Sequence, residues 1–347
     1  PYYSVIGGWV VKYLIEYIKG NGHALSTDGY FSTFISNGVS TELCFIAFSL
    51  LTLVIVFAGV KNGIERVSKI MMPILVVLSC VITVYSVTRP GALEGVKYFL
   101  VPNFKNFSWM TVVTAMGQMF YSLSIAMGIL ITFGSYTEKE VSIENSTENV
   151  EVFDTAIAIM AGLMIIPAVF AFSGGNMENL NAGPSLMFIT IPKVFDSMGL
   201  GTLIGILFFV LVLFAALTSS IALTECAVST FQDELKWSRH KSVCILGVIM
   251  LALGSLSSLG YGPLASIQII GMQFLDFFDF LTNSVMMPIS AICICLLVSK
   301  VIGVDKIAQE VKSHSNPFKR EKIFNFMIKY VCPIFATIIL LSSVANA

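Results

Sequence analysis

Residues 203–226 read LIGILFFVLVLFAALTSSIALTEC, an apolar run in which the first charged residue is Glu225. An α-helix needs about 20 consecutive apolar residues to cross the hydrocarbon core of a bilayer. Because the run has that length, it predicts a membrane-spanning helix.

The composition extends this interpretation to the whole chain. Of 347 residues, 56% are hydrophobic and only 12% are charged, and the mean hydropathy is +0.85. Charged residues make up about a quarter of an ordinary soluble domain. The sequence therefore predicts an all-α polytopic membrane protein with about nine transmembrane helices, near residues 2–18, 41–60, 70–88, 110–135, 153–173, 202–228, 242–258, 278–300 and 325–345.

The charged residues predict the orientation of these spans. Lysine and arginine gather in alternate loops, near residues 61–69, 236–241 and 306–322, which the positive-inside rule assigns to the cytoplasm. The net charge of −1 gives no electrostatic reason to expect a nucleic-acid partner. The seven cysteines form no metal-binding spacing, and the polar segments are too short for a catalytic domain, so no enzyme is expected.

Three neighbouring hydroxyl side chains lie inside the opening run, at Thr218, Ser219 and Ser220. On a helix, the carbonyl of Ala215 points toward Thr218 and Ser219, so one face offers three oxygens to a cation such as sodium. Alternatively, each hydroxyl donates to the carbonyl four residues earlier or to a neighbouring helix. Spacing alone favours this second interpretation.

The run at 110–135 is too long for one simple crossing, and its middle is polar, with Gln118, Ser122, Ser124 and Gly128 close together. A broken helix would turn free N–H and C=O groups toward a site near the midplane. A long tilted helix, with its serines bonded to neighbours, is the alternative. The sequence leaves both open.

Ionisable residues inside spans are candidates for function. Asp154 opens the fifth predicted span, Glu225 lies in the sixth, and Asp276 and Asp279 lead into the eighth. Asp154 also fits the role of a helix N-cap that faces water.

Several stretches resemble one family, the neurotransmitter:sodium symporters, in its bacterial amino-acid branch. They follow family order over nearly the whole chain and read YYSVIGGW (2–9), GVKNGIE with IMMP (59–73), PGALEG (90–95), GPSLMFITIP (183–192) and FAALTSS followed by QDEL (214–235).

The resemblance implies the LeuT-type inverted-repeat helical bundle. On this interpretation residues 1–347 form a single transmembrane domain. Residues 1–90 are the remainder of the first repeat, 110–303 are the second five-span repeat, and 325–345 are an extra C-terminal span. The first two spans of the family have no counterpart, so we expect the N-terminal part to be missing.

The resemblance also implies two sodium sites. One uses the Ala215 carbonyl with the hydroxyls of Thr218 and Ser219. The other uses Ser122 and a polar residue of the following span, for which Asp154 is the best match. An aspartate there would supply the negative charge that chloride gives in animal members, so chloride is not expected to be required.

The family's substrate pocket and gates are carried over in the same way. The Tyr3 hydroxyl would bind the carboxylate of an amino acid, although the apolar residues of the pocket would also serve as ordinary packing. Asp276 is the runner-up to Asp279 for the extracellular gate. The pocket residues are Tyr3, Ile6, Tyr121, Ser122, Ser124, Met127, Ser219 and Leu223, and the gate residues are Tyr136, Asp233 and Asp279.

The resemblance thus implies sodium-coupled uptake of a neutral, apolar or aromatic amino acid by alternating access, in the bacterial inner membrane. Its partners are the amino acid, the co-transported Na⁺ and the lipid bilayer, and a homodimer is compatible with it. A membrane amino-acid sensor that does not transport, or an inactive fragment of a transporter, remain the alternatives. A proton could replace one sodium.

Overall fold

The computed structural model describes residues 2–174, 183–313 and 318–345. This part of the chain is nearly all helical, and its single β-bridge joins Ile269 and Met272. Its elements, in which η marks a turn of 3₁₀ or of wider π-type helix, are α1 (Tyr2–Ile18), α2 (Gly22–Ser26), α3 (Tyr30–Ser36), α4 (Gly38–Phe57), η1 (Val60–Glu65), α5 (Arg66–Val87), α6 (Ala92–Leu100), η2 (Phe104–Asn106), α7 (Trp109–Ser122), α8 (Ile129–Ser135), α9 (Ile143–Ser173), η4 (Leu186–Thr190), α10 (Ile191–Asp196), α11 (Gly201–Leu235), α12 (Arg239–Leu259), α13 (Phe274–Asp279), η5 (Phe280–Met286), α14 (Met287–Leu296), η6 (Leu297–Ile302), α15 (Val304–Ser313), α16 (Glu321–Phe326), η7 (Met327–Val331) and α17 (Cys332–Ala345).

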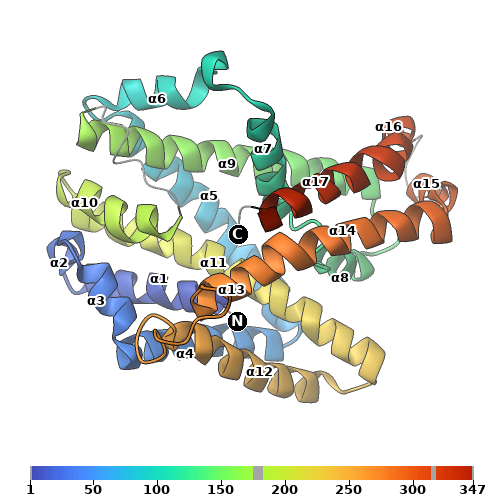
Figure 1. Cartoon of the computed structure of the whole chain (residues 1–347), viewed down its shortest axis with the longest axis horizontal. Coiled ribbons are helices and arrows are strands. Elements are labelled where there is room, and N and C mark those ends of the chain that lie inside the picture. Colours follow the sequence, from blue (N-terminus) through green and yellow to red (C-terminus); the bar gives the residue numbers. More distant parts are fainter. Residues whose placement is uncertain (1, 175–182, 314–317, 346–347) are drawn as a thin grey trace. The chain divides into compact units, whose positions relative to one another are not determined.

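Within the described residues, seven helical segments are long and apolar enough to cross a membrane. They confirm a multi-pass membrane protein but not the predicted count of nine spans. The first predicted span is a helix of 17 residues, α1. The fourth, at 110–135, is divided into α7 and α8 (Figure 1). Those two segments fall outside the seven because one is short and the other is interrupted.

The chain divides into two compact units, each described here by itself. Unit 1 comprises residues 1–102 and 157–276, and unit 2 comprises residues 103–156 and 277–347. The predicted single domain and its repeat boundaries stay predictions.

In unit 1, α1, α4, α11 and α12 pack side by side (Figure 1). Small residues permit the close approach, as is common between helices in membranes. A Cβ added to Gly8 of α1 would lie 2.7 Å from the backbone nitrogen of Phe45 in α4. Next to this contact, Trp9 and Tyr13 pack on Phe188, and the Tyr13 hydroxyl donates to the Phe188 carbonyl at 2.7 Å.

A buried ion pair joins three of these helices near their predicted cytoplasmic ends. The Glu225 side chain of α11 is fully buried, and Arg239 at the start of α12 reaches both of its oxygens, at 2.9 and 2.6 Å. The same guanidinium donates to the Val56 carbonyl near the end of α4, at 3.1 and 2.7 Å. Glu225, a candidate for function in the sequence, thus forms a structural contact between helices.

Three prolines follow wide helical turns. Pro192, Pro288 and Pro333 are each the second residue of the helix that succeeds η4, η5 and η7, respectively. A proline has no N–H to donate, and its ring crowds the carbonyl four residues earlier. A preceding turn of the π type shifts the hydrogen-bond register by one residue and relieves that conflict.

Candidate functional site

The fourth predicted span breaks at residues 123–128, between α7 and α8, so the structure adopts the broken-helix alternative. Helix α7 ends in a Schellman motif, in which Ile125 N donates to the Phe120 carbonyl at 3.0 Å and Ser124 N to the Tyr121 carbonyl at 3.1 Å. Ser124 takes the left-handed conformation that this motif requires, with φ of 54°. The accompanying apolar contact is present, because Ile125 packs on the cluster that contains Phe120.

Two further residues of the break are left-handed. Ala126 has φ of 64° and Gly128 has φ of 80°. Glycine adopts such angles readily, but an alanine there costs roughly 1–2 kcal/mol. The Ala126 carbonyl accepts a hydrogen bond from the Ser290 hydroxyl of α14, at 3.0 Å. A side chain from another helix of unit 2 therefore holds the turn.

The break also brings together two predicted sodium ligands. The Ser122 hydroxyl at the end of α7 donates to Asp154 Oδ1 of α9, at 2.6 Å. Residues 122 and 154 both belong to unit 2. Asp154 lies in the fourth turn of α9, which begins at Ile143, and is not its N-cap. A carboxylate beside a hydroxyl is an oxygen pair of the kind that binds hard cations.

The other predicted sodium ligands lie together on α11, where Thr218 adopts the back-bonded alternative and Ser220 bonds to Thr52 of the neighbouring α4. Thr218 Oγ1 is 3.0 Å from both the Phe214 and the Ala215 carbonyl oxygens. The Ala215 and Thr218 oxygens are therefore close enough to share one cation, because the Thr218 hydroxyl can donate to the Phe214 carbonyl and still offer its lone pairs. Ser219 is exposed next to them.

Unit 1 also brings two predicted substrate residues together, because the Tyr3 hydroxyl of α1 lies close to the Ser219 side chain of α11. Ile6, one turn after Tyr3, is half-buried, and Leu223, one turn after Ser219, is exposed. The remaining pocket candidates, Tyr121, Ser122, Ser124 and Met127, lie at the break in unit 2. The roles assigned to all of these residues stay predictions.

The predicted gate residues lie at helix ends. Tyr136 caps α8 and packs edge-on against Phe133. Asp233 is exposed in the last turn of α11. Asp279 accepts from the Asn283 amide at 2.7 Å, whereas Asp276, the alternative extracellular candidate, accepts from the Tyr261 hydroxyl at 3.0 Å. Their gating roles are untested by these contacts.

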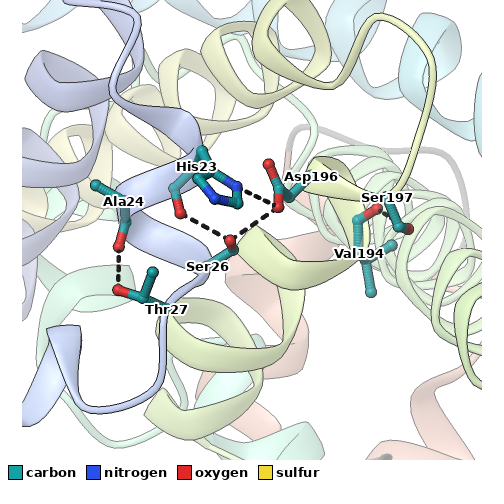
Figure 2. Close-up of polar contacts among 7 residues, drawn as sticks. All are labelled: His23, Ala24, Ser26, Thr27, Val194, Asp196 and Ser197. Carbon is teal, nitrogen blue, oxygen red and sulfur yellow. Dashed lines mark hydrogen bonds and ion pairs between the residues drawn. The ribbon is translucent and has the colours of Figure 1, made fainter.

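One polar cluster was missed by the sequence analysis (Figure 2). His23 Nδ1 and the Ser26 hydroxyl of α2 both contact Asp196 Oδ2 of α10, each at 2.9 Å. Nearby, Lys193 Nζ lies 2.5 Å from Asp28 Oδ1. These pairs connect two loops expected on the extracellular side. The partners are more than 160 positions apart, so no local pattern could have indicated them.

A membrane protein whose described residues are nearly all helical, with a span broken near its middle beside a hydroxyl–carboxylate pair, has the architecture of a secondary transporter. The chain belongs to the sodium:neurotransmitter symporter family, whose model matches residues 14–347. This confirms the family predicted from the motifs.

Comparison with individual relatives supports this family assignment. An uncharacterised sodium-dependent transporter of Bacillus subtilis (strain 168) is 34% identical over 345 residues, which cover 98% of this chain and 76% of the relative. Another, from Haemophilus influenzae, is 31% identical over 351 residues, covering 99% of this chain and 75% of the relative. The crystal structure of MhsT in complex with L-phenylalanine matches with a TM-score of 0.84 and 36% identity, covering 99% of this chain and 77% of that one.

Proposed function

We propose that the protein takes up a neutral, apolar or aromatic amino acid together with sodium, by alternating access. The observation that carries this proposal is the contact of Ser122 with Asp154 at the helix break. Membership of the symporter family supports sodium coupling. The similarity to MhsT, which was solved with L-phenylalanine, supports the substrate class.

Coupling requires that sodium and substrate strengthen each other's binding, which by linkage is reciprocal. In the proposed arrangement, the Ala215 carbonyl with Thr218 and Ser219 forms part of one ion site, and Ser122 with Asp154 forms part of the other. The Tyr3 hydroxyl, which lies close to Ser219, would bind the substrate carboxylate. A sodium ion near Ser219 and a bound amino acid would then be neighbours, so each would favour the other electrostatically.

The apolar and adaptable character of the predicted pocket favours a substrate with an uncharged side chain. Among the pocket residues implied by the family resemblance, Ile6, Leu223 and Met127 carry no charge, and methionine adapts its shape to different ligands. We further propose nine membrane crossings, of which α1 and the α7–α8 pair are the two additional ones, and a location in the bacterial inner membrane.

The test is binding of radiolabelled L-phenylalanine by the full-length protein, purified in detergent, with and without sodium. We expect sodium to increase binding, and Thr218→Val with Ser219→Ala to abolish that increase. Thr230→Val is the matched control, because Thr230 lies on the same helix and its hydroxyl bonds to the Cys226 carbonyl of its own helix. Sodium stimulation that persists in the double variant would remove the role given to these residues.

Reconstitution into liposomes separates transport from sensing. A symporter accumulates the amino acid under an inward sodium gradient. A sensor binds the amino acid but does not accumulate it, and an inactive protein does not bind it. Because Asp154 would supply the required negative charge, uptake should continue when gluconate replaces chloride. Uptake that stops in gluconate would contradict the role of Asp154.

A further inference from the structure

The break between α7 and α8 leaves backbone groups that a continuous helix would pair internally. The Schellman motif satisfies the carbonyls of Phe120 and Tyr121. The Ala126 carbonyl lies beyond that motif, in a left-handed residue whose own strain favours a different backbone conformation. Its hydrogen-bond partner comes from outside the span, and it is the hydroxyl of Ser290.

The surroundings make this partner important. Ala126 lines a cavity of about 290 Å³ within unit 2, together with Ala291, which is adjacent to Ser290 in the sequence. The other walls are mostly apolar side chains of α7, α8, α14, η7 and α17, among them Ile294 and Ile328. Because Ala126 lies in a membrane span beside an apolar cavity, leaving its carbonyl unpaired would be costly.

We propose that Ser290 is a positioning residue for the substrate and ion site at the helix break, an inference that rests on the function proposed above. The Ser290 hydroxyl fixes the Ala126 carbonyl and with it the left-handed turn. That turn sets where Ser122, Ser124 and Met127 point. Through α14, the same bond links the predicted binding segment to a neighbouring span.

The test compares Ser290→Ala, which removes the hydroxyl, with Ser290→Thr, which keeps it. Losing one neutral hydrogen bond corresponds to about a 3- to 10-fold change in an equilibrium constant. We expect Ser290→Ala to weaken sodium-dependent L-phenylalanine binding by about that factor, and Ser290→Thr to restore most of it. Ser299→Ala is the matched control, because the Ser299 hydroxyl donates to the Leu296 carbonyl, three residues earlier along the same helical segment.

A second variant distinguishes positioning from a general loss of structure. Ala126→Gly removes the steric cost of the left-handed angle at that residue, so the turn depends less on its tether. In the Ala126→Gly background, Ser290→Ala should therefore weaken binding less than it does in the wild-type background. An equal loss in both backgrounds, or a Ser290→Ala protein that is folded and binds with unchanged affinity, would overturn the proposal.

Hydrogen exchange gives a readout that does not depend on transport. We expect the amides of residues 123–128 to exchange faster in Ser290→Ala than in Ser290→Thr or Ser299→Ala. Unchanged exchange would refute the tether. If the wild-type protein binds no amino acid but exchange at the break responds as expected, the proposed function fails while the structural role of Ser290 stands.

Discussion

Removing Arg239 should destabilise the protein more than removing the whole ion pair to which it belongs. In Arg239→Met, the carboxylate of Glu225 loses its guanidinium while its side chain stays fully buried. Breaking a buried pair by deleting one partner typically costs about 3–5 kcal/mol, because a desolvated charge is left uncompensated. The Val56 carbonyl adds less to this cost, since it also accepts from the Gly59 amide at 3.1 Å.

This loss of stability corresponds to a measurable decrease in the melting temperature. At about 2.1 cal/mol/K of unfolding entropy per residue, a chain of 347 residues would melt about 4–7 °C lower. The assay is the apparent midpoint of thermal unfolding in detergent, measured at one scan rate because unfolding is expected to be irreversible. Glu225→Met with Arg239→Met removes both charges and should recover a large part of the loss.

The comparison between the single and double variants is the decisive result. If the double variant melts at or below the temperature of Arg239→Met, the uncompensated charge is not the source of the loss. If Arg239→Met melts at the same temperature as the wild type, the pair contributes nothing to stability.

Two other predictions concern packing and surface charge. Gly8→Ala should lower the free energy of unfolding by about 1–3 kcal/mol, because the added carbon meets the Phe45 backbone. Gly117→Ala is the control and should be neutral or slightly stabilising, because a Cβ there has nothing within 4 Å. Equal melting midpoints for the two variants would contradict the packing argument. The hydrogen bond and charge of Lys193 hold the pKa of Asp28 below its ordinary 3.8, so this pair stabilises the fold above that pH and its contribution is lost as the pH falls through the lowered value. The difference in melting between wild type and Asp28→Asn should therefore shrink below about pH 4, and a pH-independent difference would refute this.

The sequence predicted the helical membrane fold because apolar length is a local property. It also left open a break at 110–135, where several polar residues in a spanning run signalled a segment that hydrocarbon does not tolerate as ordinary helix. The contact of Ser122 with Asp154 agrees with their assignment to one site, although that assignment came from the family resemblance rather than from spacing.

Contacts between distant segments could not be predicted from the sequence. Arg239 was read as one of several cytoplasmic basic residues, and nothing local indicates that its side chain reaches Glu225. Ser290 looks like any serine in a spanning helix, because its importance depends on which carbonyl of another helix faces it. The left-handed Ala126 was equally hidden, since alanine normally favours a continuous helix.

The pairing of prolines with wide turns has a consequence for how these helices can move. In an ordinary helix, a turn with the wider hydrogen-bond register can migrate along the chain, because each carbonyl can change from the N–H of one residue to that of the next. Pro192, Pro288 and Pro333 have no N–H to exchange, so each fixes the register shift in the turn that precedes it. The wide turns of these helices therefore stay at fixed positions, and any change of curvature must arise in the segments between them.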